Sequence, residues 1–114
     1  MSERKEILSA YRTMNRLAQM LLERHGGFLP GEYIVLAIQE EGKPMCSTDL
    51  AADLNIGKSM LSRYFATLEK EGLVSRAFGK KDKREVVFTI TAQGKKKLAA
   101  IERDLRQTNR KETH

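Results

Sequence analysis

The segment FGKKDKREVVFTIT, residues 78–91, concentrates positive charge in a short stretch of chain. Its cations surround Asp82: Lys80, Lys81, Lys83 and Arg84. Like charges this close repel one another, which favours an external polyanion as the compensating partner. An Arg is attracted to the negative potential of an A·T-rich minor groove, and Asp82 can orient Arg84 by accepting its hydrogen bonds. The alternatives are a solvated basic face and, for Asp82, an ordinary turn residue.

A second group of polar residues lies on the helix predicted over residues 58–71. Leu61, Phe65 and Leu68 form its apolar face. Away from that face lie Lys58, Ser59, Ser62, Arg63, Ala66 and Lys70. Small side chains let a helix approach a major groove, its N-terminus favours phosphate, and Arg bonds guanine bidentately. We therefore expect Arg63 to read a base and Lys58 to bind phosphate. Met60 either packs inward or touches a thymine methyl, and a merely solvated face remains the alternative.

The elements that position these residues can be predicted from periodicity and turn signals. Helices are expected over residues 3–24, 31–41 and 58–71. A short helix should follow a cap by Ser47 or Thr48, and a final helix should follow a cap by Thr91. The three-residue turn NIG joins two short helices, with Gly57 able to supply a positive φ. Gly72 ends the second of them, and residues 73–79 and 85–91 alternate like the strands of a hairpin. The predicted fold is mainly α with a small β-hairpin.

Length and composition indicate one domain without catalytic or metal chemistry. The chain has 114 residues and a net charge of +6, and residues 55–84 carry eight cations against three anions. No apolar run reaches membrane length, and the single Cys46 favours a cytoplasmic protein. The two His residues form no metal cluster with Cys, and no nucleophile with its base stands out. We expect no enzyme, no metal, no cofactor and no membrane partner.

Taken in order, these features resemble the winged helix-turn-helix of the MarR family of bacterial transcriptional regulators. The resemblance covers residues 47–98, through STDLAADLNIGKSMLSRYFATLEKEGLVSR, the Asp-x-Arg of Asp82 and Arg84, and TITAQGKK. It implies a homodimer on a pseudo-palindromic operator, with recognition helix 58–71 in the major groove and wing 79–85 in the minor groove. The DNA-binding residues expected from residue chemistry and resemblance together are Ser47, Thr48, Lys58, Ser59, Met60, Ser62, Arg63, Arg76, Lys80, Lys81, Asp82, Lys83 and Arg84.

In that family the first and last helices of two subunits interlock, which implies dimerisation helices over residues 1–28 and 92–110 around a winged-helix core at 31–91. Their heptad-like apolar stripes suit this role, although packing within the chain explains part of each stripe. The expected dimerisation residues are Ile7, Leu8, Tyr11, Met14, Leu17, Ala18, Leu21, Leu98, Ile101 and Leu105. The chain stops a helix or more short of the family's C-terminus, so we expect either a weaker dimer or one left to the N-terminal helix. The family's cleft for phenolic or other anionic effectors is expected to be small or missing.

Three functions compete at this point. The first is a sequence-specific, dimeric transcriptional regulator, most simply a repressor. The second is a winged-helix module for protein interaction or plasmid maintenance, which steep salt dependence of DNA binding would argue against. An RNA-binding module is the weakest, because no exposed aromatic platform for stacking bases is evident.

Overall fold

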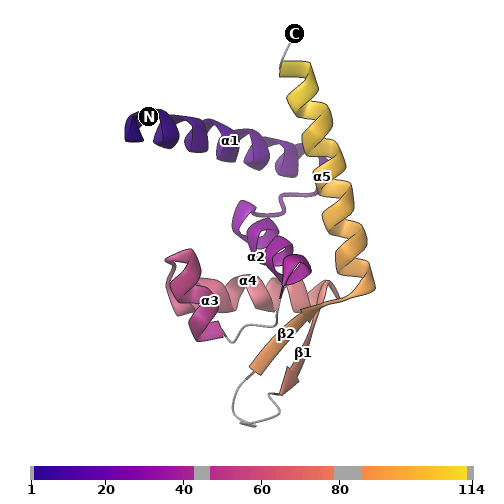
Figure 1. Ribbon diagram of the computed structural model, residues 1–114. Helices are drawn as coiled ribbons and strands as arrows, with labels where there is room; N and C mark the ends of the chain where they lie inside the picture. The colour runs from indigo at the N-terminus through magenta and orange to yellow at the C-terminus, as the bar shows by residue number, and fades with distance from the viewer. Residues whose placement is uncertain (1, 43–46, 79–85, 113–114) are drawn as a thin grey trace. The chain divides into compact units, whose positions relative to one another are not determined.

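The computed structural model describes residues 2–42, 47–78 and 86–112, and Figure 1 shows the order of its elements. These are α1 (Glu3–Arg24), α2 (Pro30–Glu41), α3 (Ser47–Leu54), α4 (Lys58–Lys70), β1 (Val74–Phe78), β2 (Val86–Ile90) and α5 (Ala92–Glu112). The predicted fold, mainly α with a small hairpin in a winged helix-turn-helix, is confirmed. Two compact units make up the chain, residues 1–30 with 99–114 and residues 31–98.

The turn between α3 and α4 is built around Asn55. Asn55 has φ 56°, whereas Gly57 has an extended backbone with φ −71° and ψ 150°. Asn tolerates the left-handed region better than other residues with a side chain, so this turn does not use the freedom of Gly57 that the sequence pointed to. The amide of Ile56 donates to the carbonyl of Ala51 at 3.1 Å and closes the turn.

The start of α3 differs by one residue from the expected cap. Ser47 is the first helical residue, so Ser47 and Thr48 both lie inside the first turn. A capping residue precedes the first helical residue, and position 46 lies outside the described residues. The expected cap by Ser47 or Thr48 is therefore wrong.

Gly72 ends α4 as the sequence predicted. Its φ of 75° is the left-handed conformation of a C′ glycine. Its amide donates to the carbonyl of Glu69 at 3.0 Å, and the amide of Leu73 donates to the carbonyl of Leu68 at 2.9 Å. This pair of bonds satisfies the last carbonyls of α4 and turns the chain directly into β1.

The hairpin packs on α4 through aromatic rings. β1 and β2 are antiparallel, with Val74 opposite Ile90 and Arg76 opposite Phe88. The ring of Phe88 stacks on that of Phe65 in α4, with centroids 4.0 Å apart and planes within 10°. The buried core of residues 31–98 consists of Val35, Leu36, Leu50, Ala51, Leu61, Phe65, Leu68, Leu73, Val74, Phe88 and Leu98.

The first turn of α5 is tied to the end of α4. The hydroxyl of Thr91 accepts from the amide of Gly94 at 3.0 Å, which confirms the predicted cap. The same hydroxyl donates to the carbonyl of Gly72 at 2.7 Å. A side chain at Gly94 would collide with the carbonyl of Leu73, so only glycine allows this close approach.

The other unit contains α1 and the later part of α5. The Ser2 hydroxyl caps α1 by accepting from the amide of Arg4 at 3.2 Å. Three residues of α1 are buried, Leu17, Met20 and Leu21, and so is Ile101 of α5. Among the described residues, no helix combines the length and apolar character that a membrane crossing requires.

Candidate nucleic-acid interface

The fourth helix presents two opposite faces with different chemistry. Leu61, Phe65 and Leu68 are 0%, 2% and 0% exposed and anchor the helix in its core. The opposite stripe recurs at steps of four, three and four, and all its members are exposed: Ser59, Arg63, Ala66 and Lys70. Because the apolar anchor is complete, the small and cationic stripe is left available to a partner.

The N-terminus of α4 is open to an anion. Its N-cap is Gly57, which has no side chain to bond the first amides, and the first turn carries no acidic residue. The positive end of the helix dipole and the amides of the first turn therefore favour a phosphate. Lys58 is exposed at this end, and Met60 is 48% exposed and does not pack into the core.

The remaining expected contacts on the helices lie beside this stripe. Ser62 of α4 and Thr48 of α3 are exposed, and Ser47 is half-buried. The charged residues of the wing, Lys80, Lys81, Asp82, Lys83 and Arg84, lie outside the described residues.

Arg76, in the middle of β1, is engaged within the chain. Its Nη2 lies 3.1 Å from Oε1 of Glu69 on α4, and the guanidinium carbon lies 5.5 Å from the ring centroid of Phe88. Glu69 was not among the functional residues expected from the sequence, because a Glu near the end of a helix is an ordinary feature.

The expected dimerisation residues divide into exposed and buried sets. On α1, Ile7, Leu8, Tyr11 and Met14 are 67%, 44%, 66% and 38% exposed. Such a row of large apolar side chains is unusual on a free surface. Leu22, exposed to 69%, continues the row one turn after Ala18, in keeping with its helical spacing.

Four of the expected dimerisation residues are instead core residues of the chain itself: Leu17, Leu21, Leu98 and Ile101. They have almost no free surface to offer a partner. Ala18 and Leu105 are half-buried and lie between the two sets.

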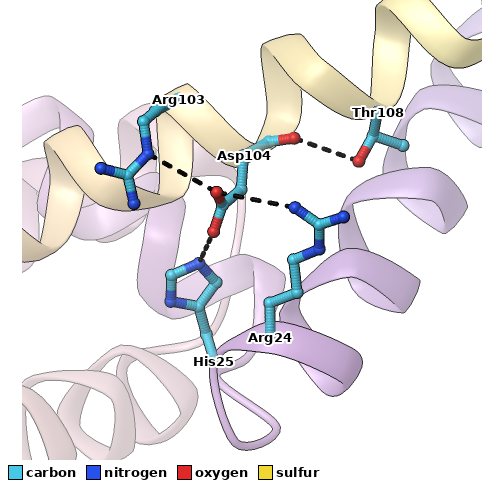
Figure 2. Close-up of polar contacts among 5 residues, drawn as sticks. All are labelled: Arg24, His25, Arg103, Asp104 and Thr108. Atoms are coloured by element: carbon cyan, nitrogen blue, oxygen red, sulfur yellow. Dashed lines mark hydrogen bonds and ion pairs between the residues drawn. The ribbon is translucent and has the colours of Figure 1, made fainter.

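A polar cluster joins the end of α1 to α5, and Figure 2 shows its side chains converging on Asp104. Nε2 of His25 lies 2.9 Å from Oδ2 of Asp104, and because a carboxylate only accepts, this nitrogen carries the proton. Nη1 of Arg24 and Nε of Arg103 lie 3.7 and 3.6 Å from the other carboxylate oxygen. The His25 and Asp104 side chains are 8% and 13% exposed.

The cluster lowers the pKa of Asp104. Partial burial alone would raise this pKa. The hydrogen bond from His25 and the positive charges of the cluster outweigh burial, so the pKa of this carboxyl lies below its ordinary value of 3.8. This pair has no local signal in the sequence, because its members lie 79 residues apart.

A hollow of about 640 Å³ lies beside the cluster in the same unit. Its walls come from α1 and from Thr108 of α5, and they include three arginines, Arg12, Arg16 and Arg24, with one acid, Glu23. The hollow therefore favours an anion. Within the described residues, no group of three or more His, Cys, Asp or Glu could hold a metal ion.

Comparison with known proteins connects this geometry to bacterial regulators. Residues 33–76, from α2 to the start of β1, match the family described as "Bacterial regulatory protein, arsR family". An uncharacterised HTH-type transcriptional regulator of Bacillus subtilis, YdgJ, is 24% identical over 103 residues, which are 90% of this chain. The chain spans 63% of the length of that curated relative.

Solved structures share the fold. MarR of E. coli superposes with a TM-score of 0.87 at 18% identity, over 98% of this chain and 82% of MarR. BpsR of Bordetella bronchiseptica, whose DNA binding is regulated by 6-hydroxynicotinic acid, superposes with a TM-score of 0.76 at 15% identity, over 96% of this chain and 78% of BpsR. The resemblance to MarR-family regulators is thus confirmed in the fold, which is a winged helix-turn-helix.

Replacing Asp104 should reveal what the cluster contributes to stability. A carboxyl whose pKa is lowered by folding stabilises the folded protein at any pH above its ordinary pKa, which is 3.8 for Asp104. That stabilisation is lost as the pH falls through the lower pKa of the folded protein. We expect Asp104→Asn to lower the free energy of unfolding at neutral pH and to flatten the acid side of its pH profile.

Urea unfolding followed by circular dichroism, from neutral pH to below 3.8, measures the free energy of unfolding at each pH. Asp53→Asn, the same change at an exposed position of α3, is the matched control. A profile for Asp104→Asn that runs parallel to the wild-type profile would contradict the stabilising role of the cluster.

Proposed function

We propose that the protein is a sequence-specific, double-stranded-DNA-binding transcriptional regulator of the bacterial cytoplasm, without enzymatic activity. It acts as a homodimer, most simply as a repressor that occludes a promoter. The observation that carries the proposal is the exposed stripe of small and cationic residues on α4, opposite a fully buried face. The helix-turn-helix fold that the chain shares with bacterial regulators supports the same function.

In this proposal α4 enters the major groove. Arg63 donates two hydrogen bonds to guanine, and Ser59 and Ala66 on either side of it are small enough to allow the approach. Lys58 and the open N-terminus of the helix bind a phosphate. Met60 is exposed and contacts a thymine methyl. Ser47, Thr48 and Ser62 flank the groove and add hydrogen bonds to the backbone.

The wing, residues 79–85, enters the flanking minor groove. In the proposal Arg84 lies in the groove and is oriented by Asp82, and the lysines of the wing neutralise phosphates. The support is the charge pattern of the sequence, together with the position of the segment between the two strands β1 and β2. Each neutralised phosphate makes binding more sensitive to salt.

A second copy of the chain covers the apolar row of α1 in the proposed dimer. Ile7, Leu8, Tyr11, Met14 and Leu22 expose large apolar surfaces that a partner would remove from water. Two recognition helices then meet successive major grooves, roughly 34 Å apart, which requires a pseudo-palindromic site.

A small anionic effector is the further partner we propose. The arginine-lined hollow beside α1 supports it, as does the regulation of BpsR by 6-hydroxynicotinic acid.

We expect a small aromatic carboxylate to change the affinity of the protein for DNA. Arg12→Gln should weaken that response without changing DNA binding in the absence of the carboxylate. Titration of a fluorescent protein–DNA complex measures both, and an equal response in the variant would place the effector elsewhere.

Selection from a random duplex library tests the proposed function directly. We expect enrichment of an inverted repeat that is bound by two chains, with the stoichiometry measured by light scattering. The affinity should fall steeply with salt, because phosphates are neutralised. Weak binding without a consensus sequence would favour the alternative function, a module for protein interaction or plasmid maintenance.

A variant separates dimerisation from DNA contact in the same experiment. Tyr11→Glu places a charge in the apolar row of α1 and leaves the sequence of α4 unchanged. The variant should be monomeric and should bind the full inverted repeat more weakly. Arg12→Gln changes an exposed residue next to it and should leave the dimer intact. Dimers of undiminished strength in the Tyr11→Glu variant would exclude the proposed interface.

Arg63→Ala tests the readout of bases. We expect it to relax specificity at one base position in each half-site and to cost about 1–3 kcal/mol of binding to the consensus. Lys58→Ala should instead weaken binding to all sequences alike and reduce the salt slope by about one. Competition binding against a panel of single-base variants measures both, and a uniform loss for Arg63→Ala would make it a phosphate contact.

A further inference from the structure

We propose that Arg76 is a positioning residue that braces the hairpin against the recognition helix and does not itself bind DNA. The inference rests on the proposed function, because it assigns α4 and the wing to one DNA site. It replaces the direct DNA contact that the charge of Arg76 led us to expect from the sequence.

The register of the hairpin puts Arg76 on the face that packs on α4. Arg76 lies directly opposite Phe88, and directly paired residues of antiparallel strands project from the same face of the sheet. That face is turned to α4, because Phe88 stacks on Phe65 with 4.0 Å between the ring centroids. Phe88 is 5% and Phe65 2% exposed, so the stack is part of the core.

The guanidinium of Arg76 is held by both elements. It lies over the ring of Phe88 at 5.5 Å, and its Nη2 is 3.1 Å from Oε1 of Glu69 on α4. A planar guanidinium can stack on an aromatic face while it donates in its own plane, which an ammonium cannot do. Arg76 thus connects β1 to α4. The carboxylate of Glu69 offsets the positive charge of the guanidinium, which would otherwise attract a phosphate.

This connection matters more for orientation than for stability. The side chains of Arg76 and Glu69 are 50% and 37% exposed, and exposed ion pairs contribute little to the free energy of folding. A two-stranded hairpin does not hold its direction alone and takes it from what it packs on. The brace therefore sets the reach of the wing relative to α4, and with it the spacing between the major-groove and minor-groove contacts.

The two possible roles of Arg76 predict opposite effects of Glu69→Gln on DNA binding. If Arg76 bound a phosphate, Glu69→Gln would release the guanidinium and strengthen DNA binding. If Arg76 is a brace, Glu69→Gln breaks it and weakens DNA binding. Glu71→Gln is the matched control, since it removes the same charge from the exposed C-cap of the same helix.

Binding to the selected duplex is measured against salt for wild type, Arg76→Ala, Glu69→Gln, the double variant and Glu71→Gln. We expect Arg76→Ala, which removes both the ion pair and the cation–π contact, to bind roughly tenfold more weakly than the control. Glu69→Gln removes the ion pair alone and should bind about threefold more weakly. The double variant should be no weaker than Arg76→Ala, and the salt slope should not change. A slope reduced by about one in Arg76→Ala, additive losses, or stronger binding by Glu69→Gln would overturn the inference.

Hydrogen exchange in the free protein separates this inference from the proposed function. The amides of β1 and β2 should exchange faster in Arg76→Ala and Glu69→Gln than in Glu71→Gln, while those of α3 keep their rates. Unchanged exchange in the hairpin would exclude the brace, even where DNA binding is normal. Faster exchange in a protein whose wild type binds no duplex would leave the brace in place and exclude the proposed function.

Discussion

The stack of Phe65 on Phe88 is the contact on which the rest of the unit at residues 31–98 depends. It anchors the buried face of α4 to the hairpin, and the exposed stripe of that helix can be polar only because the opposite face is satisfied by apolar contacts. The glycine turn at Gly72 and the hydroxyl of Thr91 add directed hydrogen bonds to the same junction. A helix held this firmly can present side chains in a defined geometry.

Much of this fold was predictable because its signals are local. The period of Leu61, Phe65 and Leu68, the C′ position of Gly72 and the cap by Thr91 each depend on residues a few positions apart. The exposed stripe of α4 follows from the same period, so this part of the candidate site was predicted together with the fold. Asn55 escaped prediction because Gly57 in the same turn offered the more familiar route to a positive φ.

The interactions between distant residues were not predictable. His25 and Asp104 meet only once α1 and α5 are folded, and neither residue type indicates the other in the sequence. The partnership of Arg76 with Glu69 depends on the register of the hairpin, which periodicity does not determine alone. The sequence also could not divide the apolar residues of α1 into buried Leu17 and Leu21 and exposed Ile7 and Tyr11, because one helical period describes both sets.

The division of the chain into units has a consequence for its synthesis. Residues 31–98 form one uninterrupted unit, whereas the other unit is assembled from residues 1–30 and 99–114. During translation the continuous unit can fold as soon as it emerges, while α1 waits for the later part of α5 to leave the ribosome. Throughout that interval the buried residues of α1, Leu17, Met20 and Leu21, lack the part of α5 that completes their unit.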